Sequence, residues 1–179
     1  MVIQSLDIMT IRVGIALYFV KGNAYLNSPS YWHCALLASS RDSWAYQPVL
    51  CLELKRGYDG RYYQSIENFN ITISSAFKGV IHLFTTNNYT VESFKSMIQS
   101  NFPAQDSGWR FPSPFVPQDW NCITWMLQIL TRLRDEGTWQ VSARAYGMSY
   151  SRIMNLGEDL MEGNNIQYEG GIRVAQFGN

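Results

Sequence analysis

The sequence is poor in the residues from which most chemical sites are built. Its 179 residues include only 3 cysteines and 2 histidines. So few cysteines, in an odd number, do not form a disulfide framework, and they favour a reducing, cytoplasmic compartment. There is no C-x-x-C or H-x-x-x-H spacing, and Gly170-Gly171 lacks the lysine and the following helix of a phosphate-binding loop. We therefore expect no metal and no cofactor.

The sequence also lacks an excess of charge and a long apolar run. Fourteen basic and 14 acidic residues cancel, and no block of like charges occurs. Nucleic acids and anionic membranes attract proteins with a net or clustered positive charge, so we expect neither as a partner. The apolar run at 13–20 is too short to span a bilayer, and the N-terminus does not resemble a signal peptide. Nothing in the sequence indicates an oligomeric state.

What is present is typical of one folded domain, which we assign to residues 1–179. Apolar residues make up 46% of the chain and charged residues 16%, enough for a sizeable core. Alternating and continuous apolar runs predict strands at 10–20, 31–39, 49–54, 62–74, 79–85 and 172–177. Three- and four-residue apolar spacing predicts a helix from a cap at Thr90 to about 100, a second from a cap at Asp119 to 136, and a third at 150–161. These elements predict an α+β fold in which an antiparallel sheet of five or six strands packs against the helix carrying Cys122, with two further helices.

The segment 119–126 is the stretch around which the chain is organised. Asp119 is a suitable N-cap for the helix that follows, since its carboxylate can accept an unpaired backbone N–H. Cys122 then falls in the first turn, where the positive end of the helix dipole favours a thiolate. Such a position suits a nucleophile. The alternative is that Cys122 is simply a small buried residue, as free cysteines often are.

Two histidines are the candidate bases for this cysteine. His33 and His82 each lie in an apolar strand, where a hydrogen-bonded core residue is the alternative interpretation. We assign His33 as general base, keep His82 in reserve, and assign Glu53 as the residue that orients the imidazole. Glu53 could instead be a solvated residue paired with Lys55 or Arg56.

An oxyanion site and a substrate pocket complete the predicted site. The backbone N–H of Cys122 and the side chain of Asn121 are the candidate oxyanion donors. Aromatic residues make up 15% of the chain, and they either line a pocket or fill the core. The candidate substrate-binding residues are Trp32, Trp109, Phe111, Trp120 and Trp125.

Two short motifs carry a resemblance to a known superfamily. Residues 31–37, Tyr-Trp-His-Cys-Ala-Leu-Leu, are followed about ninety residues later by Asn-Cys-Ile-Thr-Trp at 121–125. This layout resembles the circularly permuted branch of the NlpC/papain-like cysteine hydrolases, which includes lecithin:retinol acyltransferase-like enzymes and PPPDE-type isopeptidases. It is more similar still to uncharacterised fungal domains. The resemblance implies that His33 faces Cys122 across a cleft. Ile123 and Thr124 depart from the acyltransferase pattern, which has an acidic residue and a histidine there.

Two functional hypotheses follow. The first is a thiol-dependent hydrolase or acyl transferase that acts on an amide or ester bond of a small molecule or peptide, through a thioester on Cys122. The second is a catalytically degenerate member of the same fold that binds a small molecule or a protein.

Overall fold

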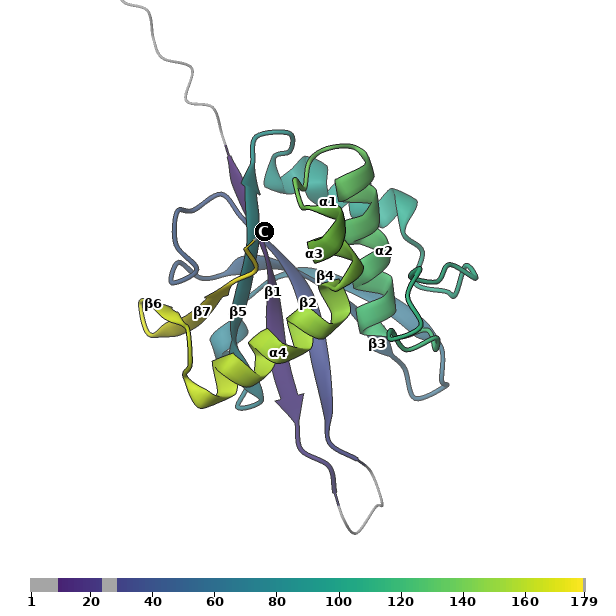
Figure 1. The fold of residues 1–179 in the computed structure, drawn as a ribbon, viewed down its shortest axis with the longest axis horizontal. Helices are drawn as coiled ribbons and strands as arrows, with labels where there is room; N and C mark the ends of the chain where they lie inside the picture. Colours follow the sequence, from purple (N-terminus) through teal and green to yellow (C-terminus); the bar gives the residue numbers. More distant parts are fainter. Residues whose placement is uncertain (1–9, 24–28, 179) are drawn as a thin grey trace, which may run out of the picture.

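The computed structural model describes residues 10–23 and 29–178, and it shows an α+β fold built on one sheet of seven strands (Figure 1). The strands are β1 (Ile11–Val20), β2 (Tyr31–Ser39), β3 (Val49–Arg56), β4 (Tyr62–Phe69), β5 (Phe77–Thr86), β6 (Gln167–Glu169) and β7 (Ile172–Gln176). The helices are α1 (Val91–Asn101), α2 (Cys122–Asp135), α3 (Ala143–Gly147) and α4 (Ser149–Glu162), with a short 3-10 helix at Ile71–Ile73.

The sheet is mostly antiparallel. Its strand order is β4-β3-β2-β1-β5-β7-β6, so the first four strands form a meander and β5 adds to the free edge of β1. Among the strands of the described residues, the β5–β7 pair alone is parallel, and the chain between these two strands runs through the four helices and β6. The predicted fold class is confirmed in outline, but the expected five or six strands were too few.

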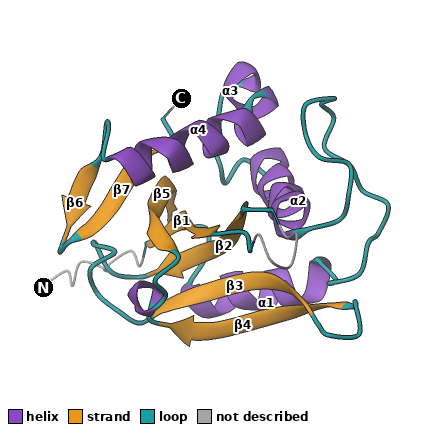
Figure 2. Cartoon of the chain, turned by 90° about the horizontal axis from the view of Figure 1, so that it is seen from below, coloured by secondary structure: helices purple, strands orange, loops and turns teal. Residues whose placement is uncertain are grey.

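The helices share one face of the sheet. Alternate residues of β1, β2 and β3 form a single apolar cluster with the buried faces of α1, α2 and α4. Figure 2 shows α2, α3 and α4 together on one side of the sheet. The opposite face has a smaller cluster around Trp44, from the loop between β2 and β3, and Ile71. Two apolar faces explain why β1 is almost continuously buried.

Three details differ from the sequence predictions. The sequence predicted two helices besides the one that carries Cys122. The structure has one more, α3, which is only five residues long. The strand predicted at 62–74 ends at Phe69, and the extra strand β6 consists of Gln167, Tyr168 and Glu169. The N-cap of α2 is Asn121 rather than Asp119.

Pairing between β2 and β3 is incomplete, and this positions the candidate site. The two strands pair only from Leu36–Leu52 to Ala38–Leu50, whereas β1 and β2 pair along nine residues. The first half of β2 therefore separates from the end of β3. The N-terminus of α2 lies at this opening, since His33, Leu54 and Cys122 line one pocket there.

Candidate active site

Cys122 is the first residue of α2, and its position is fixed by the cap of that helix. The Asn121 side-chain oxygen accepts hydrogen bonds from the N–H groups of Ile123 (2.9 Å) and Thr124 (3.0 Å). The Thr124 hydroxyl in turn accepts from the Asn121 N–H (2.8 Å). This reciprocal box satisfies the first turn except for the Cys122 N–H, which has no protein acceptor among the described residues. That N–H remains available to an oxyanion.

The segment before α2 is held in place by two tryptophans. The Trp120 indole donates to the Ala104 carbonyl (2.8 Å), and the Trp125 indole donates to the Phe102 carbonyl (3.2 Å). The Trp120 carbonyl also accepts from the Tyr62 hydroxyl (2.7 Å) at the start of β4. These bonds attach the long loop between α1 and α2 to the sheet and to α2, so the entry angle of the helix is well determined.

His33 and Glu53 meet across the gap between β2 and β3. His33 Nε2 lies 3.3 Å from Glu53 Oε1, and Glu53 Oε2 lies 2.6 Å from Lys55 Nζ. The His33 and Glu53 side chains are only 23% and 13% exposed, so the pair is shielded from bulk water. Glu53 therefore contacts His33 and also forms an ion pair with Lys55. The sequence analysis had treated these two pairings as alternatives, and the structure contains both.

The Cys122 sulfur interacts with Cys34 and His33, the two neighbouring residues that shift its pKa most. The hydrogen bond from the Cys34 thiol and the one from His33 hold the pKa of Cys122 well below its usual value, although burial opposes this. Burial also opposes a charged imidazole, but hydrogen bonds with Cys122 and Glu53 raise the pKa of His33 to about 9. The lowered pKa of Cys122 and the raised pKa of His33 together describe a thiolate paired with an imidazolium.

Cys34 is the main functional contact that the sequence analysis missed. It is 2% exposed in the core under α2, and as the donor to Cys122 its own pKa is well above the usual value. His33 and Cys34 are neighbours on a strand and point to opposite faces. Both nevertheless interact with Cys122.

Cys122 opens into a pocket of about 770 Å³ between β2, β3, α2 and α4. Its walls are rich in tyrosine and carry two cations, Lys55 and Arg56, from the end of β3. The aromatic lining residues are Tyr31, Trp32, Tyr62, Tyr63 and Tyr150. A half-buried thiol in such a pocket is accessible to a substrate of moderate size.

The predicted aromatic residues divide between the pocket and the core. Trp32 lines the Cys122 pocket. Phe111, Trp120 and Trp125 are 3%, 7% and 1% exposed and pack in the main core, with Trp109 against its edge. The Cys122 pocket is therefore lined mainly by tyrosines rather than by the expected tryptophans. Nothing in the sequence pattern marked the exposed Tyr31 and Tyr63 as lining residues.

His82 is separate from this site. It lies on β5 with its ring 6.1 Å from that of Trp44, and its Nδ1 is buried with no hydrogen-bond partner among the described residues. Burial, helped by the nearby Arg12, lowers the pKa of His82 to about 4. The structure thus brings His33, and not His82, to Cys122.

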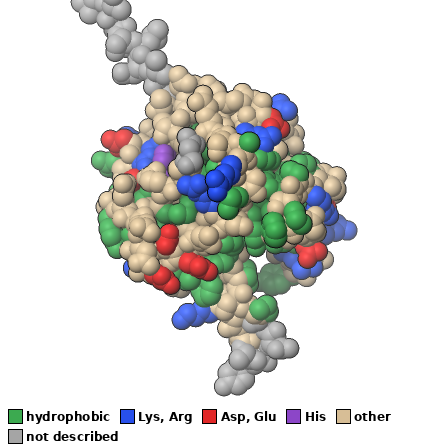
Figure 3. Space-filling view, viewed as in Figure 1, with side chains coloured by type: hydrophobic (Ala, Val, Ile, Leu, Met, Phe, Trp, Pro, Cys, Tyr) green, Lys and Arg blue, Asp and Glu red, His purple; other side chains and the backbone are tan. Residues whose placement is uncertain are grey.

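Comparison with known proteins gives no relative from which a function can be transferred. No protein-family model, curated protein or solved structure matches the chain at a significant level. In the part of the chain that is described, no group of three or more His, Cys, Asp or Glu side chains is arranged to hold a metal ion. No described helix is long and apolar enough to cross a membrane. The face seen in Figure 3 carries acidic, basic and apolar side chains side by side.

Proposed function

We propose that the protein is a thiol-dependent hydrolase or acyl transferase that acts on an amide or ester bond. The observation that carries this proposal is the chain from Cys122 to His33 to Glu53 at the mouth of an open pocket. A nucleophile, a base in contact with it and a third group that orients the base are the parts that covalent acyl transfer requires.

The proposed reaction has two halves. The Cys122 thiolate attacks the substrate carbonyl carbon, and the carbonyl electron pair moves to the oxygen. When the electron pair on the oxyanion re-forms the carbonyl double bond, the bond to the amine or alcohol breaks, and the leaving group takes the proton of the His33 imidazolium. A thioester on Cys122 remains. His33, now neutral, removes a proton from water or from an acceptor nucleophile, which attacks the thioester and releases the acyl group while the thiolate and imidazolium are restored.

The oxyanion of each tetrahedral intermediate needs donors beside Cys122. The unpaired Cys122 N–H is one donor. The Asn121 amide NH₂ is the other candidate, because its oxygen is used as the helix cap and fixes the orientation of the side chain. Removing one such donor in other enzymes costs about 3 kcal/mol of barrier.

We also propose that the chain belongs to the circularly permuted branch of the NlpC/papain-like superfamily. The support is the chain order, in which a strand carries the histidine, the meander of β3 and β4 follows, and the cysteine then opens a helix. The reaction needs a free thiol, so we place the protein in a reducing compartment such as the cytoplasm.

The test uses p-nitrophenyl acetate as an acyl donor. We expect an acetyl group on Cys122, located by peptide mass spectrometry, and repeated turnover of the ester. Cys122→Ser should abolish both, and His33→Asn should abolish turnover. The controls are Cys51→Ala and His82→Asn, which lie outside the Cys122 pocket and should retain turnover.

The result separates the enzyme from a binding module of the same fold. Acetylation of all three cysteines at similar slow rates, with no turnover, would show that Cys122 is not an activated nucleophile. Equal turnover by wild type and His33→Asn would remove His33 from the mechanism.

A further inference from the structure

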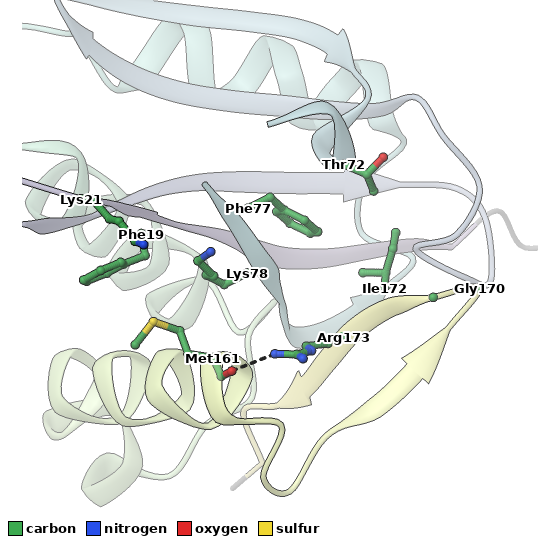
Figure 4. A pocket seen from close by; sticks show the side chains of 10 residues that line it. Phe19, Lys21, Thr72, Phe77, Lys78, Met161, Gly170, Ile172 and Arg173 are labelled. Carbon is green, nitrogen blue, oxygen red and sulfur yellow. Dashed lines mark hydrogen bonds between the residues drawn. The ribbon is translucent and has the colours of Figure 1, made fainter. Parts of the chain in front are cut away.

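A second pocket, of about 710 Å³, lies between the end of β1, the start of β5, the turn before β7 and the end of α4 (Figure 4). It shares no lining residue with the Cys122 pocket. The proposed reaction makes no use of it.

Three cations line this second pocket, and no carboxylate does. Lys21 follows β1, Lys78 belongs to β5 and Arg173 belongs to β7. None of the three forms an ion pair with an acidic side chain in the described ranges 10–23 and 29–178. In a chain of zero net charge, this is a local excess of positive charge that an anion would neutralise.

Arg173 is held rigidly at the pocket wall. Its Nη1 donates to the carbonyls of Leu160 (2.6 Å) and Met161 (2.9 Å) in the last turn of α4. The guanidinium has five N–H donors, so others remain for a ligand. Figure 4 shows Lys78 between Lys21 and Arg173, with the ring of Phe77 beside them.

The rest of the pocket offers an apolar surface and a tight turn. Phe77 is fixed by a tilted ring contact with Tyr18, at 5.7 Å between centroids, and Ile172 lies farther along the wall. Gly170 and Gly171, with φ of +54° and +87°, form the turn between β6 and β7. Neither glycine N–H has a protein acceptor among the described residues, so both remain as donors.

We propose that this pocket binds a small phosphate monoester that carries a flat ring. The phosphate dianion lies among Lys21, Lys78 and Arg173, where three cations match its charge and its acceptor oxygens. The ring lies against Phe77, and polar groups at its far end reach the turn at Gly170 and Gly171.

The test is isothermal titration of the whole protein with phenyl phosphate. We expect one binding site, competition by inorganic phosphate and no binding of phenol, which lacks the charge. The double variant with Lys21→Gln and Lys78→Gln should weaken binding by about tenfold or more, because two charge-assisted contacts are lost. Both side chains lie at the surface or only half-buried, so the variant should fold, which circular dichroism checks.

Two controls complete the design. Lys95→Gln removes a charge from α1 and should leave the affinity unchanged. Cys122→Ser should also bind phenyl phosphate as wild type does, so this result is independent of the proposed catalysis. Equal affinity of wild type and the double variant would overturn the proposal. So would binding only to vesicles that contain phosphatidic acid, because that result would assign the site to a lipid surface.

Discussion

Replacing Glu53 by glutamine would remove the charge that stabilises the His33 imidazolium while keeping the shape of the side chain. The pKa of His33 is raised from 6.5 to about 9, which corresponds to about 3 kcal/mol in favour of the protonated ring. Hydrogen bonds with Cys122 and Glu53 supply this stabilisation. If Glu53 supplies about half, the variant should lower the pKa of His33 by about one unit. The unpaired Lys55 would add to this change, because it lies beside the same site.

Loss of the His33 proton leaves the Cys122 thiolate without its counter-ion and changes its reactivity. We therefore expect the alkaline step in the pH profile for alkylation of Cys122 by iodoacetamide, which reports this deprotonation, to move to lower pH by about one unit.

Peptide mass spectrometry measures the rate at each cysteine, and the buried Cys34 and Cys51 serve as internal references. Glu67→Gln, at an exposed position of β4, is the matched control and should leave the profile unchanged. A profile of Glu53→Gln identical to wild type, or an equal change in Glu67→Gln, would refute the role of Glu53.

Three further predictions concern the neighbours of this site and the acid stability of the fold. Cys34→Ala removes the thiol that donates to Cys122, so the pKa of Cys122 should rise and its alkylation at pH 6 should slow, whereas Cys51→Ala should change neither. Asn121→Ala removes the cap of α2 and should lower the free energy of unfolding in urea by about 1 kcal/mol; Thr90→Ala, at the cap of α1, should cost a similar amount without changing alkylation of Cys122. The folded-state pKa of His82 is about 4, below its ordinary 6.5, so the unfolded chain binds this proton first as pH falls. Stability should thus decline between pH 6.5 and 4, and the decline should be shallower in His82→Gln; parallel pH profiles of wild type and variant would contradict the assignment.

Regular apolar periodicity allowed most of the fold to be predicted. The strands β1, β2, β3 and β5 bury alternate or all residues, and α1, α2 and α4 have clear apolar stripes. Elements without such a pattern were missed. The three residues of β6 are held by pairing with β7, and both β6 and α3 are too short for a periodic signal.

Two residues could cap the start of α2, and this explains why Asp119 was wrongly predicted as the N-cap. Asp119 and Asn121 are both good caps by residue type. Thr124 decides between them, because its hydroxyl completes the reciprocal box only with Asn121. The residue type alone did not carry this information.

The candidate site depended on contacts that are distant in sequence. The order of His33 and Cys122 could be read from the chain, and a strand after His33 was the natural place for a third residue. The role of Cys34 could not be predicted, because alternation along a regular strand places it on the face opposite to His33. Its contact with Cys122 comes from the packing of α2 on the sheet, where Cys34 lies in the core beside residues of that helix.

The most direct test of the central claim is the ultraviolet absorbance of the thiolate as a function of pH, taken as the difference between wild type and Cys122→Ser. We predict that the Cys122 signal is already complete at neutral pH and is lost only on acidification, because Cys34 and His33 stabilise the ionised sulfur. A signal that appears only as the pH approaches the ordinary cysteine value of 9.0 would contradict the account.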